Sequence, residues 1–264
     1  MELITSNKNE KIKNLQALLK LKKERDRQGF FVIEGLRIFK DTLETAPECI
    51  ESIFVSESFS SSSAMDEIKD KLLKSEISSE YEKILAVKDN VFENISQTVT
   101  PQGIMCTVKK PYYSVKNIIG KKILLLENIQ DPGNLGTMLR TAEAAGVSGI
   151  IMSRDCADIF SPKVVRSTMG SIFRMPFVYC ENFYAAIEEL KGYGITVYAA
   201  YLHGGVPYQE ITYSEKAAIL IGNEGNGLSR EAVELADKRI YIPMAGKIES
   251  LNAAIAAAIL MYHV

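Results

Sequence analysis

Three polar segments in the second half of the chain carry the residue types that could do chemistry. Each follows an apolar run and places glycine, asparagine and one or two charged residues within a few positions. They are Asn128–Gly136 with its continuation to Ala142, Ile221–Ser229, and Ile242–Met244 with Glu249–Asn252. Open α/β sheets bind ligands at turns that follow the carboxyl ends of their strands. Three such turns in one domain predict a composite ligand site.

The spacing of these residues argues against several common sites. The glycines Gly222, Gly225 and Gly227 do not have the G-x-G-x-x-G spacing of a dinucleotide-binding turn, and there is no Walker lysine or G-x-S-x-G elbow. Two histidines and four widely spaced cysteines indicate neither a metal site nor a disulfide framework. What remains is a tight turn with free backbone N–H groups and one carboxylate, Glu224.

Taken one at a time, the polar residues also have ordinary structural interpretations. Asn134 suits a helix cap, Arg140 a solvated helix flank, Ser250 the N-cap of the last helix, and Asn252 a polar first turn. Together with Glu224, however, they all fall at helix starts or strand ends on the predicted carboxyl edge of one sheet. This coincidence favours a functional site.

The elements that must position these residues alternate regularly from Lys121 onward. Strands are expected at 123–126, 149–152, 196–200, 217–221 and 240–242. Asp131–Pro132 and Ser161–Pro162 predict helix starts, and Gly146 suits a helix end. A last helix, with Leu251, Ala254, Ile255, Ala258 and Ile259 on one face, is expected after a Ser250 cap. The alternation predicts a mostly parallel sheet with helices on both faces.

The first half predicts a smaller α/β unit. Strands are expected at 30–33, 53–55, 83–87 and 103–108, with helices near 12–22, 36–43 and 65–74 and a loop at the serine cluster Ser58–Ser63. Residues 111–120 have the polar character of a linker. The predicted organisation is therefore a domain at 1–110, a linker at 111–120 and a second domain at 121–264.

Charge is unevenly distributed along the chain. The 264 residues have a net charge of −2, yet Lys8–Arg27 holds eight basic residues against three acidic ones. A solvated amphipathic helix commonly explains such a stretch, but the local patch is also compatible with phosphate contacts.

The composition is that of a soluble globular protein, with 47% hydrophobic and 24% charged residues. The longest apolar stretch, Ala253–Met261, is too short to cross a bilayer, and the N-terminus lacks the layout of a signal peptide. These features predict a cytoplasmic protein with no membrane partner.

Over 121–264 the chain resembles the SpoU (TrmH) family of RNA 2′-O-ribose methyltransferases, part of the SPOUT superfamily. The three polar segments match the three family motifs in order. The resemblance implies a trefoil-knotted sheet, S-adenosylmethionine as cofactor, and a homodimer. The first domain is similar to small ribosomal proteins that bind kinked RNA, which implies an RNA substrate-binding domain and no role for DNA.

The resemblance also implies roles for individual residues. It implies catalytic or ribose-orienting roles for Asn134, Arg140, Glu224, Ser250 and Asn252. It implies cofactor contacts from Gly222, Leu228, Ile242, Met244 and Leu251. In the first domain it implies RNA contacts from Lys11, Lys13, Lys22, Lys23, Arg25 and Arg27. Family members often carry a serine directly after the last motif asparagine, whereas Ala253–Ala254 follow Asn252 here.

The leading functional prediction is methyl transfer to a ribose 2′-hydroxyl in structured RNA, with 23S ribosomal RNA favoured over transfer RNA. A non-catalytic RNA-binding or ribosome-assembly protein is the alternative, although it has no need of Arg140, Glu224, Ser250 and Asn252 together. A nucleotide-dependent oxidoreductase is not supported, because the sequence lacks the dinucleotide-binding fingerprint. The sequence leaves open which nucleotide is methylated, and whether Arg140 acts as a base or electrostatically; a guanidinium pKa above about 12 favours the electrostatic role.

Overall fold

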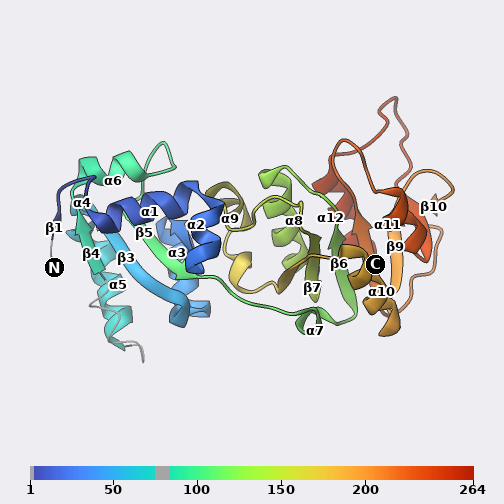
Figure 1. Cartoon of the computed structure of the whole chain (residues 1–264), viewed down its shortest axis with the longest axis horizontal. Coiled ribbons are helices and arrows are strands. Elements are labelled where there is room, and N and C mark those ends of the chain that lie inside the picture. The colour runs from blue at the N-terminus through green and yellow to red at the C-terminus, as the bar shows by residue number, and fades with distance from the viewer. Residues whose placement is uncertain (1–2, 75–83) are drawn as a thin grey trace. The chain divides into compact units, whose positions relative to one another are not determined.

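The computed structural model describes residues 3–74 and 84–264 (Figure 1). These residues form two compact units. The first comprises Met1–Pro111 together with Phe160–Phe173, and the second comprises Tyr112–Ile159 and Arg174–Val264. Within the described residues, no helix combines the length and apolar character needed to cross a bilayer.

The first unit is built on a five-stranded sheet in the order β1-β4-β3-β5-β2. Its strands are β1 (Leu3–Ile4), β2 (Phe30–Glu34), β3 (Ile50–Ser56), β4 (Ile84–Val87) and β5 (Ile104–Lys109). β1, β4 and β3 pair in parallel, whereas β5 pairs antiparallel with both β3 and β2. The predicted strands of this unit are therefore present, and the short β1 is an addition.

Helices flank this sheet. They are α1 (Glu10–Lys20), α2 (Lys22–Gln28), α3 (Leu36–Thr45), α4 (Glu57–Ser60), α5 (Ser63–Lys74) and α6 (Asp89–Ile95). α1 and α6 bury Ile12, Leu15 and Phe92 against sheet residues such as Val32 and Phe54. The prediction of a plain loop at Ser58–Ser63 was wrong, because the Ser56 hydroxyl accepts a hydrogen bond from Phe59 N and starts the turn of α4.

The second unit contains a seven-stranded sheet in the order β10-β12-β9-β11-β6-β7-β8, whose described pairs are all parallel. The strands are β6 (Lys122–Leu126), β7 (Gly149–Ser153), β8 (Phe177–Cys180), β9 (Thr196–Ala200), β10 (Val206–Pro207), β11 (Ala217–Ile221) and β12 (Lys238–Tyr241). This arrangement confirms the predicted α/β class with a mostly parallel sheet.

Helices cover both faces of this sheet. They are α7 (Val115–Ile118), α8 (Pro132–Ala144), α10 (Phe183–Gly192), α11 (Arg230–Leu235) and α12 (Ala253–His263). α10 and α11 pack Ile187, Leu190 and Val233 against one face. α8 and α12 contact each other and the other face (Figure 1). α9 (Pro162–Thr168) follows β7 in the sequence, but it lies within Phe160–Phe173 and therefore belongs to the first unit.

The caps of α8 follow the sequence prediction. Asp131 accepts a hydrogen bond from Asn134 N, Pro132 is the first helical residue, and Gly146 beyond the helix end has a φ of 69°. The last helix differs from expectation. Its N-cap is Asn252, whose Oδ1 accepts hydrogen bonds from Ala254 N and Ile255 N, so the predicted Ser250 cap was wrong.

Lys122, the first residue of β6, joins the ends of two helices. Its Nζ donates to Met261 O of α12 at 2.8 Å and to Ala145 O at the end of α8 at 3.3 Å. Burial lowers the pKa of this ammonium group. A cation at the carboxyl end of a helix interacts favourably with the helix dipole. Lys122 therefore stabilises the carboxyl ends of both α8 and α12, the helices that support the polar segments.

Candidate active site

Glu224 is the centre of a hydrogen-bond network in the second unit. Its carboxylate accepts hydrogen bonds from Gln130 N and Asp131 N, both at 3.1 Å, and from Asn134 Nδ2 at 3.0 Å. The carboxylate therefore fixes the loop that enters α8 against the turn that follows β11.

Asn134 extends this network to the third polar segment. Its Oδ1 accepts a hydrogen bond from Asn252 Nδ2 at 2.9 Å, across 118 positions of sequence. Asn252 also caps α12 through its Oδ1. The Nδ2 and the Oδ1 of each asparagine are thus both hydrogen-bonded, which fixes the orientation of the side-chain amide. One chain of contacts, Glu224–Asn134–Asn252, joins all three predicted segments.

The turn after β11 is held by its own backbone. Asn223 and Gly227 exchange backbone hydrogen bonds at 2.9 and 3.0 Å, and Asn223 Oδ1 accepts from Gly225 N and Asn226 N. Asn223 Nδ2 donates to the carbonyl of Asn128, a residue with a φ of 55°. Asparagine tolerates this left-handed conformation better than most residues, so Asn128 can turn the chain sharply at the end of β6.

The network borders an open cavity of about 580 Å³. Its lining comes from all three segments and consists of Gln130, Asp131, Pro132, Asn134, Asn223, Glu224, Gly225, Leu251, Asn252 and Ala253. The cavity offers amide groups and carboxylates beside the apolar Leu251 side chain. This donor set suits a ligand that combines hydrogen-bonding groups with a cationic centre.

The structure brings together only part of the predicted site. Asn134, Glu224, Asn252 and Leu251 line the cavity, whereas Arg140 and Ser250 are exposed and are not among its lining residues. Leu228 is 8% exposed and lines a different cavity. Gly222, Ile242 and Met244 belong to the polar segments but do not line this cavity.

Several contributors to the site were not predicted. The backbone N–H groups of Gln130 and Asp131 and the side chain of Asn223 carry the network, and Asn128 shapes the turn. Backbone donors leave no trace in a sequence. Asn128 and Asn223, in contrast, each lie two residues beyond the end of an apolar strand, and that position is a usable signal.

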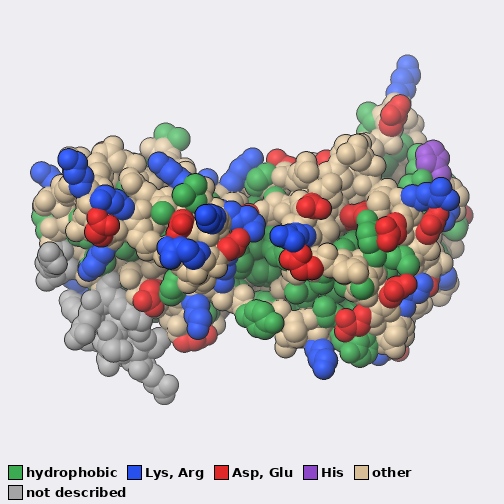
Figure 2. All heavy atoms as spheres, in the orientation of Figure 1, with side chains coloured by type: hydrophobic (Ala, Val, Ile, Leu, Met, Phe, Trp, Pro, Cys, Tyr) green, Lys and Arg blue, Asp and Glu red, His purple; other side chains and the backbone are tan. Residues whose placement is uncertain are grey.

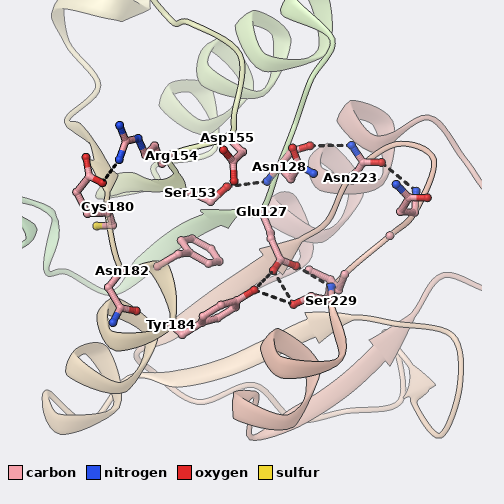
Figure 3. A pocket seen from close by; sticks show the side chains of 15 residues that line it. Glu127, Asn128, Ser153, Arg154, Asp155, Cys180, Asn182, Tyr184, Asn223 and Ser229 are labelled. Atoms are coloured by element: carbon pink, nitrogen blue, oxygen red, sulfur yellow. Dashed lines mark hydrogen bonds and ion pairs between the residues drawn. The ribbon is translucent and has the colours of Figure 1, made fainter.

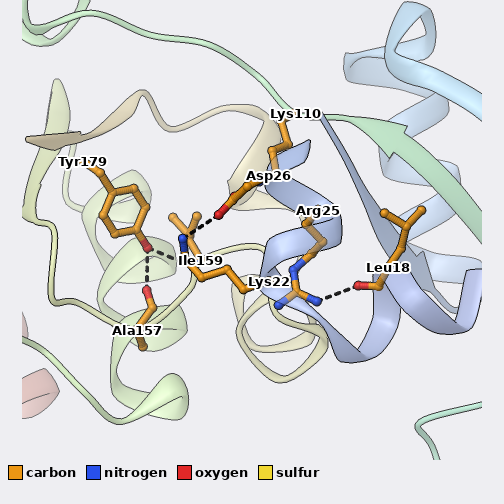
Figure 4. A network of polar contacts seen from close by, with 8 residues as sticks. All are labelled: Leu18, Lys22, Arg25, Asp26, Lys110, Ala157, Ile159 and Tyr179. Atoms are coloured by element: carbon orange, nitrogen blue, oxygen red, sulfur yellow. Dashed lines mark hydrogen bonds and ion pairs between the residues drawn. The ribbon is translucent and has the colours of Figure 1, made fainter. Parts of the chain in front are cut away.

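In the first unit, Arg25 is an exception among the predicted RNA-contacting residues. It is 4% exposed, and its guanidinium donates to the carbonyl of Leu18 at 2.6 Å (Figure 4). It also donates to the carbonyl of Leu19 at 3.3 Å. Its guanidinium satisfies backbone carbonyls at the carboxyl end of α1, so the prediction that Arg25 contacts RNA was wrong. The other five basic residues are exposed: Lys11, Lys13, Lys22, Lys23 and Arg27.

The protonation of Glu224 is tied to this geometry. Burial alone raises the pKa of its carboxyl, but the hydrogen bonds from Asn134 and from the Gln130 and Asp131 backbone outweigh it, and the pKa falls below its usual 4.5. The lowered folded pKa means that the ionised carboxylate stabilises the fold above pH 4.5, and that this contribution is lost as pH falls through the folded value.

We therefore expect Glu224→Gln to lower the free energy of unfolding by about 1 kcal/mol at neutral pH, because the new amide places a donor against N–H donors. The difference from wild type should shrink as pH falls from 4.5 through the lower folded pKa, where the wild-type carboxyl also becomes protonated. Urea unfolding across this pH range measures it. A difference that is the same at pH 7 and pH 4 would contradict the assignment.

A metal is not indicated by the described residues, among which no group of three or more His, Cys, Asp or Glu side chains could hold one. S-adenosylmethionine fits the cavity better on chemical grounds. Its positive sulfonium is compatible with a lining that contains the carboxylates of Asp131 and Glu224, and the Leu251 side chain offers apolar contact.

Known proteins agree with this chemistry. The SpoU rRNA Methylase family model matches residues 121–262, and the MRM3-like substrate binding domain model matches residues 9–106. The chain is 38% identical over 266 residues to the 23S rRNA (guanosine(2553)-2′-O)-methyltransferase RlmP of Bacillus subtilis, covering 100% of this chain and 99% of that protein.

Solved structures show the same similarity. An AdoMet-bound rRNA methyltransferase from Sinorhizobium meliloti superposes with a TM-score of 0.85 at 32% identity, covering 99% of this chain and 96% of that one. The SpoU methyltransferase AviRb from Streptomyces viridochromogenes superposes with a TM-score of 0.82 at 27% identity, covering 97% and 96%. These relatives confirm the predicted enzyme class and its cofactor. The chain belongs to the SpoU rRNA methylase family.

Proposed function

We propose that this protein transfers a methyl group from S-adenosylmethionine to a ribose 2′-hydroxyl of 23S ribosomal RNA. The observation that carries the proposal is the Glu224–Asn134–Asn252 network, which joins three distant segments around one cavity. The similarity to RlmP over the whole chain favours 23S ribosomal RNA over transfer RNA as the substrate.

S-adenosylmethionine, when bound, would supply the methyl group for a displacement in which the ribose oxygen bonds to the methyl carbon, the electrons of the broken carbon–sulfur bond return to sulfur in S-adenosylhomocysteine, and the hydroxyl proton passes to solvent. The chain's own task is to position the ribose and to stabilise the charge that develops on its oxygen. Asn134 and Asn252 are suited to orient the ribose, because their amides are fixed by Glu224 and by the start of α12.

Arg140 completes the proposed site from a second copy of the chain. It is exposed on α8 and outside the cavity of its own chain. A homodimer through α12 would bring a partner arginine to the site. Ile255 and Tyr262 of this helix are 51% and 65% exposed, an apolar surface that association would cover. The segment 161–175 is a second proposed dimer surface.

The remaining family features belong to this proposal. Residues 1–110 form the RNA substrate-binding domain, 111–120 the linker and 121–264 the methyltransferase domain. The last segment passes through a trefoil knot, and Gly222, Leu228, Ile242, Met244 and Leu251 hold the cofactor there. Ser250 helps to orient the third motif segment. The enzyme acts in the cytoplasm, where ribosomal RNA is found.

The first unit offers a surface suited to RNA. Figure 2 shows Lys and Arg side chains gathered over α1 and α2. Beside α1 lies a groove of about 430 Å³ with Lys11 and Asn14 in its lining and the half-buried ring of Phe30. Basic groups next to an accessible aromatic ring suit phosphates and unstacked bases.

Charge removal on this surface tests its role. Lys11 and Lys23 have no ion-pair partner within the described parts of the chain, whereas Lys13, Lys22 and Arg27 are paired with acidic neighbours. We expect Lys11→Ala/Lys23→Ala to weaken RNA binding and to reduce the slope of log affinity against log salt by about 1 to 2. The control Lys69→Ala/Lys71→Ala on α5 removes the same charge elsewhere in the domain and should leave the slope unchanged. Equal slopes for both double variants would exclude phosphate contacts at Lys11 and Lys23.

The proposed function is tested by mapping ribose 2′-O-methylation in ribosomal and transfer RNA from cells with and without the gene. We expect one site in 23S ribosomal RNA to lose its methyl group and to regain it with the wild-type protein. A lost site in transfer RNA, or no lost site at all, would overturn the assignment.

A further inference from the structure

A second cavity, of about 510 Å³, opens at the carboxyl ends of β6, β7 and β8 in the same unit (Figure 3). In the sheet order β6 lies between β7 and β11, and the chain runs from β6 to β7 and β8 on one side and later returns to β11 on the other. This is a topological switch point, where α/β sheets characteristically form a ligand crevice. Glu224, Asn134 and Asn252 do not line this cavity, although Asn128 and Asn223 do.

The two cavities share a wall. Asn223 is in the lining of both, and the Asn223–Gly227 turn that separates them is closed by two backbone hydrogen bonds. A polynucleotide chain with one ribose in the first cavity therefore has its neighbouring nucleotides within reach of the second.

The second cavity has a fixed aromatic wall. The carboxylate of Glu127, which is 7% exposed, accepts hydrogen bonds from Ser229 N at 2.8 Å, Ser229 Oγ at 2.6 Å and the Tyr184 hydroxyl at 3.0 Å. The Tyr184 hydroxyl is also 3.2 Å from Ser229 Oγ. Figure 3 shows the ring of Tyr184 held beside Glu127 and Ser229 at the edge of the cavity. A ring fixed in this way is a pre-formed stacking surface, because little side-chain entropy is lost when a ligand packs on it.

The charge of the lining limits which classes of ligand the second cavity can bind. Three carboxylates, from Glu127, Asp155 and Glu181, face one guanidinium, from Arg154, which is paired with Glu181 at 2.5 Å. This excess of negative charge disfavours a phosphate inside the cavity. It is compatible with an uncharged planar heterocycle that carries N–H donors, which describes a nucleobase.

We propose that the second cavity binds a nucleobase of the substrate RNA next to the methylated nucleotide, stacked on Tyr184. The proposal rests on the proposed RNA methyltransferase function and adds a base-binding subsite to it. An adenine can also come from the cofactor, so the test must separate a base of the RNA from the adenine of S-adenosylmethionine.

The first experiment compares Tyr184→Leu with Tyr184→Phe, using 23S ribosomal RNA isolated from cells that lack the protein. Leucine removes the stacking ring, whereas phenylalanine keeps the ring and removes only the hydroxyl. We expect Tyr184→Leu to raise the KM for RNA about tenfold, as the loss of one base–aromatic stack does. The affinity for S-adenosylmethionine should stay unchanged, and Tyr184→Phe should remain within about twofold of wild type in KM.

Other patterns would overturn the proposal. A weaker affinity for S-adenosylmethionine in Tyr184→Leu would assign the cavity to the cofactor's adenine. Parallel losses in Tm, kcat and both affinities, shared by Tyr184→Phe, would make Tyr184 structural. An unchanged KM for RNA in Tyr184→Leu would remove the subsite altogether.

A second experiment uses the wild-type protein and therefore does not depend on whether a variant folds. Ultraviolet crosslinking of the wild-type protein to the same RNA, followed by peptide mapping, should place a crosslinked base on the peptide that contains Tyr184. Crosslinks confined to other peptides would refute the subsite. Absence of any methyl transfer by the wild-type protein would instead refute the proposed function, so the two failures are distinguishable.

Discussion

Replacing Arg140 with alanine is expected to lower the rate of methyl transfer by about 10²- to 10³-fold, the usual cost of removing one group that stabilises developing negative charge. The affinity for S-adenosylmethionine should change little, because Arg140 is exposed and lies outside the cavity of its own chain. Single-turnover kinetics and calorimetric cofactor binding measure the two quantities separately. Equal losses in both would indicate a folding defect instead.

A mixing experiment tests whether Arg140 acts on the partner's site. Protomers that carry Arg140→Ala are combined with protomers that carry Asn252→Ala, both of which are inactive alone. If the arginine acts across a two-fold dimer, each mixed dimer contains one intact site, and random exchange restores about a quarter of wild-type activity. No recovery after verified subunit exchange would place the arginine in the site of its own chain.

Replacing Gly222 with alanine is expected to open the turn after β11. The added Cβ would lie 2.3 Å from Gly227 C, 2.4 Å from Leu228 N and 2.5 Å from Gly227 O. All three atoms belong to the backbone, so no side chain can move aside. We expect a loss of about 1–3 kcal/mol in the free energy of unfolding, as for other overpacked positions. Cofactor binding should weaken by more than about tenfold, because the displaced turn carries Asn223 and Glu224.

The matched control is Gly246→Ala, between the two parts of the third polar segment. A Cβ at Gly246 would meet no atom within 4 Å, so this variant should retain the stability and cofactor affinity of wild type. Denaturant unfolding and calorimetry compare the two variants. A Gly222→Ala protein with unchanged cofactor affinity would contradict a role for this turn in holding the cofactor.

Much of the fold could be predicted because the signals were local. Apolar runs such as Ile123–Leu126 are strands buried on both faces, and Asp131–Pro132 starts α8 as its residue types indicate. The misses have identifiable causes. β10, which was not predicted, is only two residues long, and α4 is a single turn whose start depends on the Ser56 cap. At the last helix, Ser250 and Asn252 are both good capping residues, and only their final geometry separates them.

The candidate site was predicted to the extent that side chains carry it. Asn134, Glu224 and Asn252 were singled out and do meet, although the sequence alone does not give their pairing. The N–H donors of Gln130 and Asp131 escaped notice because every residue except proline has one. Arg25 shows the opposite error. Its charge indicates an exposed residue, but in the folded chain its guanidinium is buried and donates hydrogen bonds to two backbone carbonyls.

The bonds from Asn252 to Asn134 and from Lys122 to Met261 also join parts of the chain that are synthesised at different times. The ribosome makes β6 and α8 before α12, so the amide of Asn134 and the carboxyl end of α8 meet these partners only after α12 has been translated. A nascent chain that lacks α12 has the first two motif segments but not the contact that orients them. The full Glu224–Asn134–Asn252 network is therefore completed only when α12 packs beside α8.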